Sequence, residues 1–328
     1  MRQRTDNSTK VPRFIGITGA TGFMGKYISR HLLATGRYQI RALSRFAAAP
    51  ERRSEAIEWR RGDLNAPRDC EAFVRGLGAV IHLAHTNTPL SSHRDWAGDA
   101  VLNIVPTLNL IEALRREGRR VDLVFASSGG AMYEPRAERS RFKETDAAHP
   151  NSPYGVAKLA IENYLRLAAD QGWLRVTVLR IGNAYGTPLP PQRRQGLIGI
   201  AIHHVLRGEP VPVYGDLRNV RDWVHLADVG EMVERCLEPR RPFDIFNVGS
   251  GRGASTEEVL DLIEKAVGHP IRRQRLVDVD DAHRLVSWAV LDITKAEHEL
   301  GWRPRIALED GIRNLFLEYK AKIPVENP

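Results

Sequence analysis

Short apolar runs alternate with longer amphipathic stretches over the first 180 residues. The longer stretches have apolar residues at three- and four-residue intervals, as expected for helices that bury one face. The apolar runs are Phe14–Thr18, Gln39–Ser44, Ile57–Trp59, Ala79–Leu83, Asp122–Ala126 and Val176–Leu179, and the amphipathic stretches are Met24–Thr35, Asn103–Glu117 and Tyr154–Gln171. Such alternation predicts a parallel sheet with helical crossovers. We therefore expect a doubly wound α/β sheet of six strands.

The alternation becomes irregular after Arg180, where prolines interrupt it at Pro188, Pro190, Pro191, Pro210 and Pro212. We therefore expect a first domain at residues 1–180 and a smaller α/β lobe at residues 181–328. Within the second range, Arg221–Leu237 has the pattern of a strand and a helix, so residues 221–250 are expected to return to the first sheet. Ser255 and Glu258 have capping-box spacing, which predicts a helix that ends at Gly268.

The charge balance is basic, but it is not concentrated in one tract. The 328 residues include 48 Lys and Arg against 40 Asp and Glu, a formal net charge of +8. Arginines are scattered from Arg2 to Arg313, and no basic stripe is interleaved with aromatic residues. A nucleic-acid partner is therefore not expected. The charge fits either a phosphate-bearing small ligand or a solvated surface.

Cysteine usage and hydropathy predict a cytoplasmic protein. Cys70 and Cys236 are far apart and have no nearby Cys or His at metal-ligand spacing, so neither a disulfide framework nor a metal site is expected. Met1–Arg13 lacks the apolar region of a signal peptide. No apolar run is long enough to span a bilayer, so we expect no membrane association.

A glycine-rich turn follows the first predicted strand and precedes the first predicted helix. Its sequence is Thr18-Gly19-Ala20-Thr21-Gly22-Phe23-Met24-Gly25. Glycines let the backbone turn tightly and approach a pyrophosphate, whose charge is stabilised by the N–H groups and dipole of a helix N-terminus. The glycine spacing departs by one residue from the usual dinucleotide fingerprint, and a bare turn is the alternative. The strand–turn–helix context favours nucleotide binding.

Two further strand ends bear on the nucleotide. The second strand ends in Leu43-Ser44-Arg45, where NAD-binding domains often have an acid for the ribose 2′-hydroxyl. Arg45 can instead pair with a 2′-phosphate, which favours NADP, or it can be a solvated loop charge. After the third strand, Asp63 can accept a hydrogen bond from an adenine amino group or serve as a helix N-cap.

Tyr154 and Lys158 are the main catalytic candidates. Pro153 marks a helix start, and a four-residue spacing places the phenol and the ammonium on one helix face. A nearby positive charge favours the phenolate, so we expect Lys158 to lower the pKa of Tyr154 and make it a base near neutral pH. An isolated Tyr-x-x-x-Lys is usually a solvated helix face. Its position after the strand segment Ala126–Tyr133 favours catalysis.

With these motifs in this order, the chain resembles the extended short-chain dehydrogenase/reductases, in particular the NAD-dependent epimerase/dehydratase family and its UDP-glucose 4-epimerases. The resemblance runs from Gly19–Gly25 to Glu299–Pro304. Between them lie His82-Leu83-Ala84-His85, Asn103 with Thr107, Arg180–Gly186, Val220–His225 and Phe246–Gly251. The resemblance implies a Rossmann sheet with a smaller C-terminal substrate lobe, NAD as cofactor and a nucleoside-diphosphate sugar as substrate.

The resemblance also implies roles for individual residues. The pyrophosphate is expected at the glycine turn. Asp63 and Leu64 are expected at the adenine, and Leu83 and Ala84 along the dinucleotide. The other expected cofactor contacts are Thr21, Ser44, Arg45, His85, Ser127 and Ile181. Lys158 is expected to hold the nicotinamide ribose, and Tyr154 to act as the base. Asn183 and Arg221 correspond to positions that bind the substrate diphosphate, with Tyr214 near the nucleotide base. Asn183 and Tyr214 can instead be structural.

Two departures from the family's pattern bear on the substrate. The family's catalytic Ser or Thr lies four residues before the tyrosine of the strand motif, and counting back from Tyr133 gives Gly129. The hydrogen bond to the sugar oxygen is then expected to come from Ser128, the nearest hydroxyl, or from Ser127. The alternatives are a group of the substrate itself or a water molecule. Ser128 and Gly129 are both expected to contact the sugar. The usual arginine for the second phosphate is not in register, and Arg284 is the closest substitute.

The leading interpretation is a nucleotide-sugar 4-epimerase of the UDP-hexose type. Tyr154 removes the proton of the 4-hydroxyl while hydride passes to NAD⁺, and the hydride returns to the opposite face of the 4-keto sugar. The segment Ser127–Gly130 lacks the Asp-Glu pair of the family's 4,6-dehydratases. The alternatives are an NADPH-dependent 4-ketoreductase of a nucleotide-linked deoxysugar, supported by Arg45, and a non-catalytic cofactor-binding protein.

The resemblance also implies a homodimer through the predicted helices Asn103–Glu117 and Tyr154–Gln171. The apolar faces of these helices can equally be part of the intramolecular core.

Overall fold

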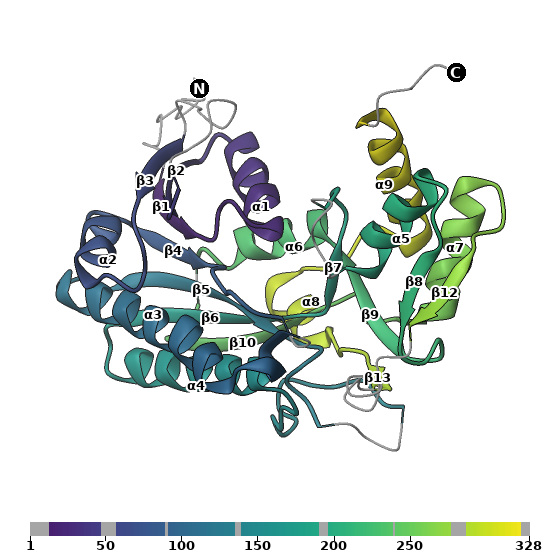
Figure 1. Cartoon of the computed structure of the whole chain (residues 1–328). Coiled ribbons are helices and arrows are strands. Elements are labelled where there is room, and N and C mark those ends of the chain that lie inside the picture. The colour runs from purple at the N-terminus through teal and green to yellow at the C-terminus, as the bar shows by residue number, and fades with distance from the viewer. Residues whose placement is uncertain are drawn as a thin grey trace, which may run out of the picture.

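A seven-stranded parallel sheet forms the larger part of the protein (Figure 1). The computed structural model describes residues 13–46, 57–88, 91–134, 139–189, 196–238, 240–276 and 287–322. The strands of this sheet are β1 (Arg13–Thr18), β2 (Tyr38–Ser44), β3 (Ile57–Arg61), β4 (Ala79–His82), β5 (Val121–Ser128), β6 (Leu174–Ile181) and β10 (Phe243–Val248). Their order is β10-β6-β5-β4-β1-β2-β3. This order reverses beside β1, as in dinucleotide-binding sheets, and confirms the expected doubly wound α/β fold.

Six of these strands lie where the alternation of the sequence predicts them. The seventh, β10, pairs with β6 from Phe243 against Val176 to Val248 against Ile181, so a segment distant in sequence completes the sheet. The strand at the start of the segment 221–250, β9 (Val220–His225), does not join it. Instead β9 pairs with three short strands, which are β7 (Asn183–Tyr185), β11 (Gly253–Ser255) and β13 (Trp288–Ala289).

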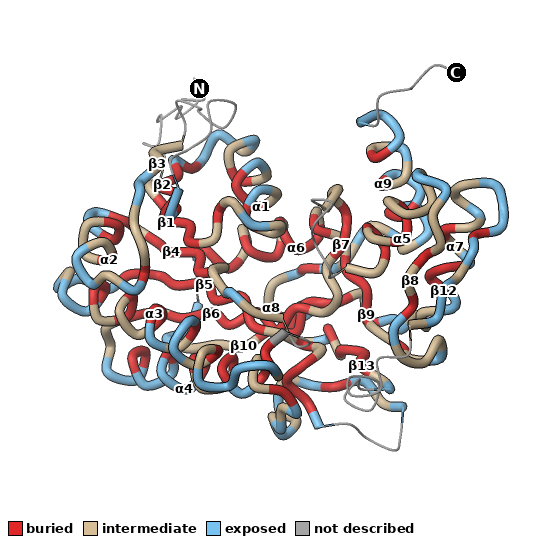
Figure 2. The backbone as a smooth tube through the Cα atoms, viewed as in Figure 1, coloured by how far each residue is buried: buried red, intermediate tan, exposed pale blue. Residues whose placement is uncertain are grey.

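Helices cover both faces of the large sheet, and each face has its own apolar core. Buried residues of α1, α6 and α8, such as Ile28 and Met232, form one core. Buried residues of α2, α3 and α4, such as Phe73 and Leu110, form the other, so the strands between are largely buried (Figure 2). The helices are α1 (Phe23–Ala34), α2 (Pro67–Val74), α3 (Trp96–Arg116), α4 (Pro153–Asp170), α6 (Leu226–Arg235) and α8 (Thr294–Leu300).

Helix α3 begins earlier than the sequence pattern indicates. It starts at Trp96 rather than Asn103, because the Asp95 side chain caps it by accepting a hydrogen bond of 2.8 Å from Gly98 N. Pro106 lies inside the helix, and Val101 and Val105 are exposed. These residues obscure the amphipathic period in its first half. No helix in the described part of the chain has the length and apolarity needed to cross a membrane.

A smaller α/β assembly packs beside the carboxyl ends of the large sheet's strands (Figure 1). Its core includes Ile202, Trp223, Ile263 and Ile312. The predicted capping box is confirmed, because Glu258 N donates to Ser255 Oγ (3.1 Å) and Ser255 N to Glu258 Oε2 (2.6 Å). The remaining elements are α5 (Leu197–Leu206), β8 (Val211–Tyr214), α7 (Thr256–Val267), which ends at Gly268, β12 (Arg273–Leu276), α9 (Leu308–Lys322) and the short 3₁₀ helix η2 (Ser91–Arg94).

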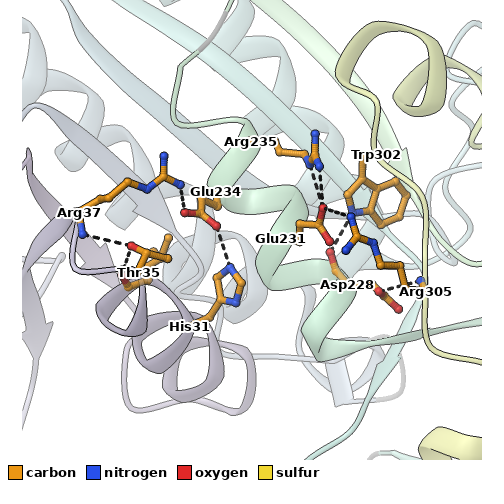
Figure 3. Close-up of polar contacts among 10 residues, drawn as sticks. His31, Thr35, Arg37, Asp228, Glu231, Glu234, Arg235, Trp302 and Arg305 are labelled. Atoms are coloured by element: carbon orange, nitrogen blue, oxygen red, sulfur yellow. Dashed lines mark hydrogen bonds and ion pairs between the residues drawn. The ribbon is translucent and has the colours of Figure 1, made fainter. Parts of the chain in front are cut away.

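Polar contacts attach α6 to α1 on one side and to the segment after α8 on the other (Figure 3). His31 Nε2 lies 3.0 Å from Glu234 Oε2. The carboxylate of Asp228 accepts a hydrogen bond of 2.9 Å from Arg305 N, and its carbonyl oxygen accepts one of 3.0 Å from Trp302 Nε1. Trp302 is fully buried. The chain segments 225–248 and 294–306 are thereby fixed against the large sheet.

Candidate active site

The turn between β1 and α1 is closed so tightly that two of its positions, Gly19 and Gly25, require glycine. Gly19 has φ +72°, and a Cβ there would lie 2.8 Å from Ala84 N. Gly22 N donates to Gly19 O at 2.9 Å, and a Cβ on Gly25 would come within 2.1 Å of the same oxygen. No side chain caps α1, and its first turn has no acidic residue. The turn residues Thr21, Phe23 and Met24 thus surround a helix N-terminus that suits a phosphate group.

The ends of β2 and β3 lie beside each other, because Gly62 N donates to Ser44 O at 2.9 Å. Ser44 is buried, whereas Arg45 is exposed and its guanidinium lies 5.9 Å from the centroid of the Phe46 ring. Asp63 Oδ1 accepts hydrogen bonds from Asn65 N (2.9 Å) and Asn65 Nδ2 (3.0 Å).

Asp63 is not a helix N-cap. Helix α2 begins after Ala66, which occupies the N-cap position, so the N-cap alternative for Asp63 is wrong. Leu64 is buried beside Asp63, and its carbonyl oxygen accepts a hydrogen bond of 2.9 Å from Asn109 Nδ2 in α3. The Asp63–Leu64 segment is therefore held at the same sheet edge as the glycine turn.

A buried histidine joins β1, β4 and α3 below the glycine turn. His82 Nδ1 lies 2.7 Å from Thr18 Oγ1, and His82 Nε2 lies 3.0 Å from Thr107 Oγ1. Thr18 Oγ1 also accepts a hydrogen bond of 3.3 Å from Ala84 N. These contacts hold the segment Leu83–Ala84 against Gly19. Burial, reinforced by the charge of Lys158, lowers the pKa of His82 to about 3, so its imidazole is neutral.

Tyr154 and Lys158 lie together at the start of α4. Ser152 caps the helix by accepting a hydrogen bond of 3.2 Å from Gly155 N, and Tyr154 N donates to Ser92 Oγ at 3.1 Å. Lys158 Nζ donates to Ala126 O at 2.7 Å and lies 5.7 Å from the centroid of the Tyr154 ring. The phenol and the ammonium are thus brought to the carboxyl end of β5, as the helical spacing predicts.

The expected lowering of the Tyr154 pKa is wrong for the protein without ligands. Burial raises the pKa of Tyr154 to about 12, because it removes water from the phenolate, and the charge of Asp99 also raises it. A hydrogen bond with Ser128 acts in the opposite direction. Burial lowers the pKa of Lys158 to about 7, and the charges of Glu162 and Asp99 oppose that shift. Desolvation therefore outweighs the attraction between the two groups.

Ser128, rather than Gly129 or Ser127, supplies the hydroxyl next to the phenol. Ser128 lies beside Tyr154 and acts to lower the pKa of the phenol, whereas Ser127 Oγ donates to Glu162 Oε1 at 2.5 Å. Gly129 N donates to Ile181 O at 2.8 Å. A Cβ at Gly129 would lie 2.6 Å from Leu291 Cδ1 and 3.1 Å from Arg180 O, so this position has no room for a Ser or Thr.

His85 closes another side of the Tyr154 ring. The two rings are edge to face, with centroids 4.8 Å apart and planes at 85°. His85 Nε2 is buried and has no hydrogen-bond partner among the described residues. Burial strongly lowers the pKa of this histidine, and the nearby Lys158 lowers it further. A neutral imidazole therefore packs edge to face with the phenol ring of Tyr154.

Of the residues expected to hold the substrate, two come from the sheet centred on β9. Arg221 lies on β9, and Asn183 on the adjacent β7 pairs with Trp223. Arg221 Nη1 donates to Val220 O at 2.9 Å. No ion pair joins it to a carboxylate in the described part of the chain, and burial alone lowers its pKa to about 10.

The other two substrate candidates are Tyr214 and Arg284. Tyr214, at the end of β8, is 48% exposed, and Arg284 lies outside the described residues. The described residues contain no group of three His, Cys, Asp or Glu side chains that could hold a metal ion. An orphaned imidazole nitrogen, a glycine-lined helix N-terminus and an arginine without an acidic partner together fit a dinucleotide and an anionic substrate.

Three polar residues of the site escape the sequence analysis. Ser92 fixes the start of α4, Asp99 is buried on α3 and receives a hydrogen bond of 2.8 Å from Asn87 Nδ2, and Glu162 binds Ser127. Only Glu162 has a sequence signal, its four-residue spacing from Lys158. The other two lie in segments whose spacing from Tyr154 carries no periodic pattern.

Comparison with known proteins gives concordant matches. Residues 15–249 match the model of the NAD dependent epimerase/dehydratase family. A dTDP-4-dehydro-6-deoxyglucose reductase of Escherichia coli is 31% identical over 247 residues, which cover 75% of this chain and 76% of that protein.

Two solved structures are similar over nearly the whole fold. The UDP-glucose 4-epimerase of Thermotoga maritima with UDP-glucose has a TM-score of 0.86 and 30% identity, and covers 94% of this chain and 99% of that one. The Thermus thermophilus UDP-glucose 4-epimerase complex with NAD has a TM-score of 0.86 and 32% identity, covering 94% and 100%. The chain belongs to the NAD-dependent epimerase/dehydratase family of extended short-chain dehydrogenase/reductases.

Proposed function

We propose that this protein is a nucleotide-sugar 4-epimerase of the UDP-hexose type that works with tightly bound NAD. The observation that carries the proposal is the placement of Tyr154 beside Lys158, with Ser128 next to the phenol, at the carboxyl edge of the sheet. The glycine turn lies at the same edge. The similarity to two UDP-glucose 4-epimerase structures supports the reaction class.

In this proposal the side chains divide the acid–base work. Tyr154 takes the proton of the sugar 4-hydroxyl and later returns it, while Ser128 holds the sugar oxygen by a hydrogen bond. The charge of Lys158 stabilises the phenolate form of Tyr154. NAD, held at the glycine turn and by Lys158, would supply reversible hydride transfer at C4 of the sugar. Inversion at C4 would require the sugar to turn over within the site, and no cofactor would be consumed.

Residues of the smaller assembly hold the nucleotide in this proposal. The guanidinium of Arg221 can bind a diphosphate through two parallel hydrogen bonds, and it has no acidic partner among the described residues that would compete. In this proposal Asn183 assists from the adjacent strand, and Tyr214 contacts the nucleotide. Arg284, the remaining substrate candidate, lies outside the described residues. Residues 1–180 form the cofactor domain together with the part of residues 221–250 that packs on them. The rest of residues 181–328 forms the substrate lobe.

The remaining cofactor contacts follow from the sheet edge. We assign the pyrophosphate to the glycine turn and the adenine to Asp63 and Leu64. Ser44, Leu83, Ala84, His85, Ser127 and Ile181 are assigned to the rest of the dinucleotide. Arg45 is exposed at the end of β2, and NADP is the alternative cofactor because an arginine there can pair with a 2′-phosphate.

A second candidate function is an NADPH-dependent 4-ketoreductase of a nucleotide-linked deoxysugar. The position of Arg45 and the similarity to the E. coli reductase favour it. The same Tyr154 would then donate a proton to the carbonyl oxygen rather than remove one. This alternative predicts net oxidation of added cofactor, which an epimerase does not cause.

We also propose a cytoplasmic homodimer joined through α3 and α4. Both helices expose large apolar side chains, including Trp96 (70%) and Val101 (55%) on α3 and Val156 (53%) and Leu167 (52%) on α4. Two such helix pairs can bury these residues in a four-helix contact. Size-exclusion chromatography with light scattering tests this, and charged substitutions at Val101 and Leu167 should give a monomer.

The experiment for the proposed function is to denature the purified protein, identify the released dinucleotide, and assay the native protein with UDP-hexoses without added cofactor. Released NAD together with interconversion of the gluco and galacto anomeric NMR signals supports the epimerase. A protein that binds NADPH and gives no interconversion refutes the epimerase and favours the ketoreductase.

A further inference from the structure

A buried ion pair lies one helical turn beyond Lys158. Glu162 follows Lys158 by four residues on α4, so both side chains lie on the same face of the helix. Glu162 is 3% exposed and Arg180 of β6 is 4% exposed. Arg180 Nη2 donates to Glu162 Oε2 at 2.8 Å, Arg180 Nε donates to Glu162 Oε1 at 3.3 Å, and Ser127 Oγ donates to Oε1 at 2.5 Å. Three donors thus hold this carboxylate.

The ion pair is anchored further by a chain of buried hydrogen bonds. Arg180 Nη1 donates to Tyr133 Oη at 3.1 Å, and Tyr133 Oη donates to Asn247 Oδ1 at 2.6 Å. Asn247 Nδ2 donates to Phe142 O at 2.8 Å. Tyr133 and Asn247 are themselves buried. The Glu162 charge is therefore fixed in position relative to Lys158 and cannot move away to solvent.

The charged and titratable groups around Lys158 come from β4, the segment that follows it, α3 and α4. His82 ends β4, His85 follows it, Asp99 comes from α3, and Tyr154 and Glu162 lie on α4. Both histidines are neutral because burial lowers their pKa values. Asp99 and Glu162 are therefore the groups whose negative charge favours the ammonium.

The two carboxylates differ in what they act on. The charge of Asp99 raises the pKa of Tyr154 as well as that of Lys158. The charge of Glu162 raises the pKa of Lys158. Its carboxylate is fixed by Arg180 and Ser127 one helical turn from Lys158, so its influence on the ammonium does not depend on side-chain motion.

We propose that Glu162 is a positioning residue whose carboxylate, fixed by Arg180 and Ser127 one helical turn from Lys158, favours the ammonium form of that side chain. This inference rests on the proposed role of Lys158 beside Tyr154. Arg180 and Ser127 hold the carboxylate in place. Glu162 therefore acts through Lys158 in this proposal and is not assigned a contact with the substrate.

The test is an NMR titration of lysine side chains in the ligand-free full chain. The protein has only eight lysines, so ¹³Cε-labelled lysine gives few signals, and Lys158→Met assigns the one of interest. In the wild type the Lys158 midpoint is expected near 7. In Glu162→Gln it should fall by about one pH unit or more, because an opposite charge has been lost from its surroundings.

Two further variants keep the test decisive if Glu162→Gln is poorly folded with Arg180 left unpaired. The double variant Glu162→Gln/Arg180→Gln removes both buried charges, and the Lys158 midpoint should still fall because Glu162 is the one that acts on Lys158. Tyr133→Phe loosens the network but keeps the carboxylate, so it should lower stability and leave the midpoint within about 0.3 pH unit of wild type.

An unchanged Lys158 midpoint in the folded double variant overturns the inference, as does an equal fall in Tyr133→Phe. Because the titration needs neither cofactor nor substrate, it is independent of the enzymatic assay. Failure of the protein to interconvert UDP-hexoses would refute the proposed function while leaving the titration result readable. A shifted midpoint with normal interconversion supports both.

Discussion

Gly129 packs directly against Leu291, a residue of the distant segment that follows β13. A Cβ at position 129 would lie 2.6 Å from Leu291 Cδ1 and 2.9 Å from Leu291 Cδ2, and 3.1 Å from the carbonyl oxygen of Arg180. Leu291 is buried with Met132, Tyr133 and Phe142 in a small apolar cluster. The absence of a hydroxyl at position 129 is therefore a consequence of packing, and Ser128 takes the position beside the phenol.

Gly129→Ser should destabilise the protein rather than add a catalytic hydroxyl. The new side chain overlaps Leu291 and the Arg180 carbonyl, and overpacking of this kind costs about 1–3 kcal/mol. Urea unfolding measures the loss. The double variant Gly129→Ser/Leu291→Ala makes room for the serine, so it should recover part of the stability relative to Leu291→Ala alone. Equal stability of wild type and Gly129→Ser would contradict the packing argument.

Ser128→Ala should lower kcat by about 10²–10³-fold and leave the fold intact, because loss of a single positioned hydrogen-bond donor has an effect of that size. Initial rates with a UDP-hexose give kcat, and circular dichroism checks folding. The matched control is Ser140→Ala, a serine outside the site whose carbonyl, rather than hydroxyl, bonds Trp288 Nε1. A Ser128→Ala rate within twofold of wild type would show that another group binds the sugar oxygen.

The stability of the protein should depend on pH through Lys158. Its folded pKa is about 7 against an ordinary value of 10.5, so between these values the unfolded chain binds a proton that the folded chain lacks. Stability relative to Lys158→Met should therefore rise with pH between 7 and 9, by up to about 1.4 kcal/mol per pH unit. Urea unfolding of both proteins at pH 6, 7, 8 and 9 gives this difference. A difference that stays flat or falls would contradict the lowered pKa.

Arg221→Met should weaken binding of UDP without destabilising the protein. The side chain is largely buried and its charge has no acidic partner in the described part of the chain, so a neutral side chain of similar length relieves a desolvation cost. We expect the Kd for UDP, measured by calorimetry, to rise about 10–100-fold, as for loss of a charge-assisted pair. Arg218→Met is the control, because Arg218 is exposed and pairs with Asp216 at 2.7 Å. Equal effects of the two substitutions would remove Arg221 from the binding site.

Local patterns were sufficient for the first six strands and for α1 and α4. Each of these elements has a clear period and a turn or cap at its ends, so the sheet of this family could be predicted without tertiary information. β9 could not be assigned to its sheet in this way, because a single strand pattern does not identify its partners. Its pairing with β7, β11 and β13 depends on segments from 183 to 289.

The sequence predicted that Tyr154 and Lys158 lie close together, but it did not predict their electrostatics. The spacing of Tyr154 and Lys158 places them on one helix face, and it correctly brings them together. The sequence does not show how much water is removed from each group, and this desolvation raises the pKa of Tyr154 and lowers that of Lys158. Likewise, the clash of a side chain at position 129 with Leu291 depends on a contact between residues 162 positions apart.

The most direct test of the central claim uses UDP-galactose with deuterium at C4 of the sugar, incubated with the protein without added cofactor. Transfer of hydride within one closed site predicts UDP-glucose that retains deuterium at C4, with no exchange with solvent and no net change in the dinucleotide. Tyr154→Phe should abolish this conversion, while Tyr164→Phe, an exposed tyrosine on the same helix, should not. Absence of UDP-glucose from the wild-type reaction, or loss of the deuterium to water, would contradict the proposed epimerase mechanism.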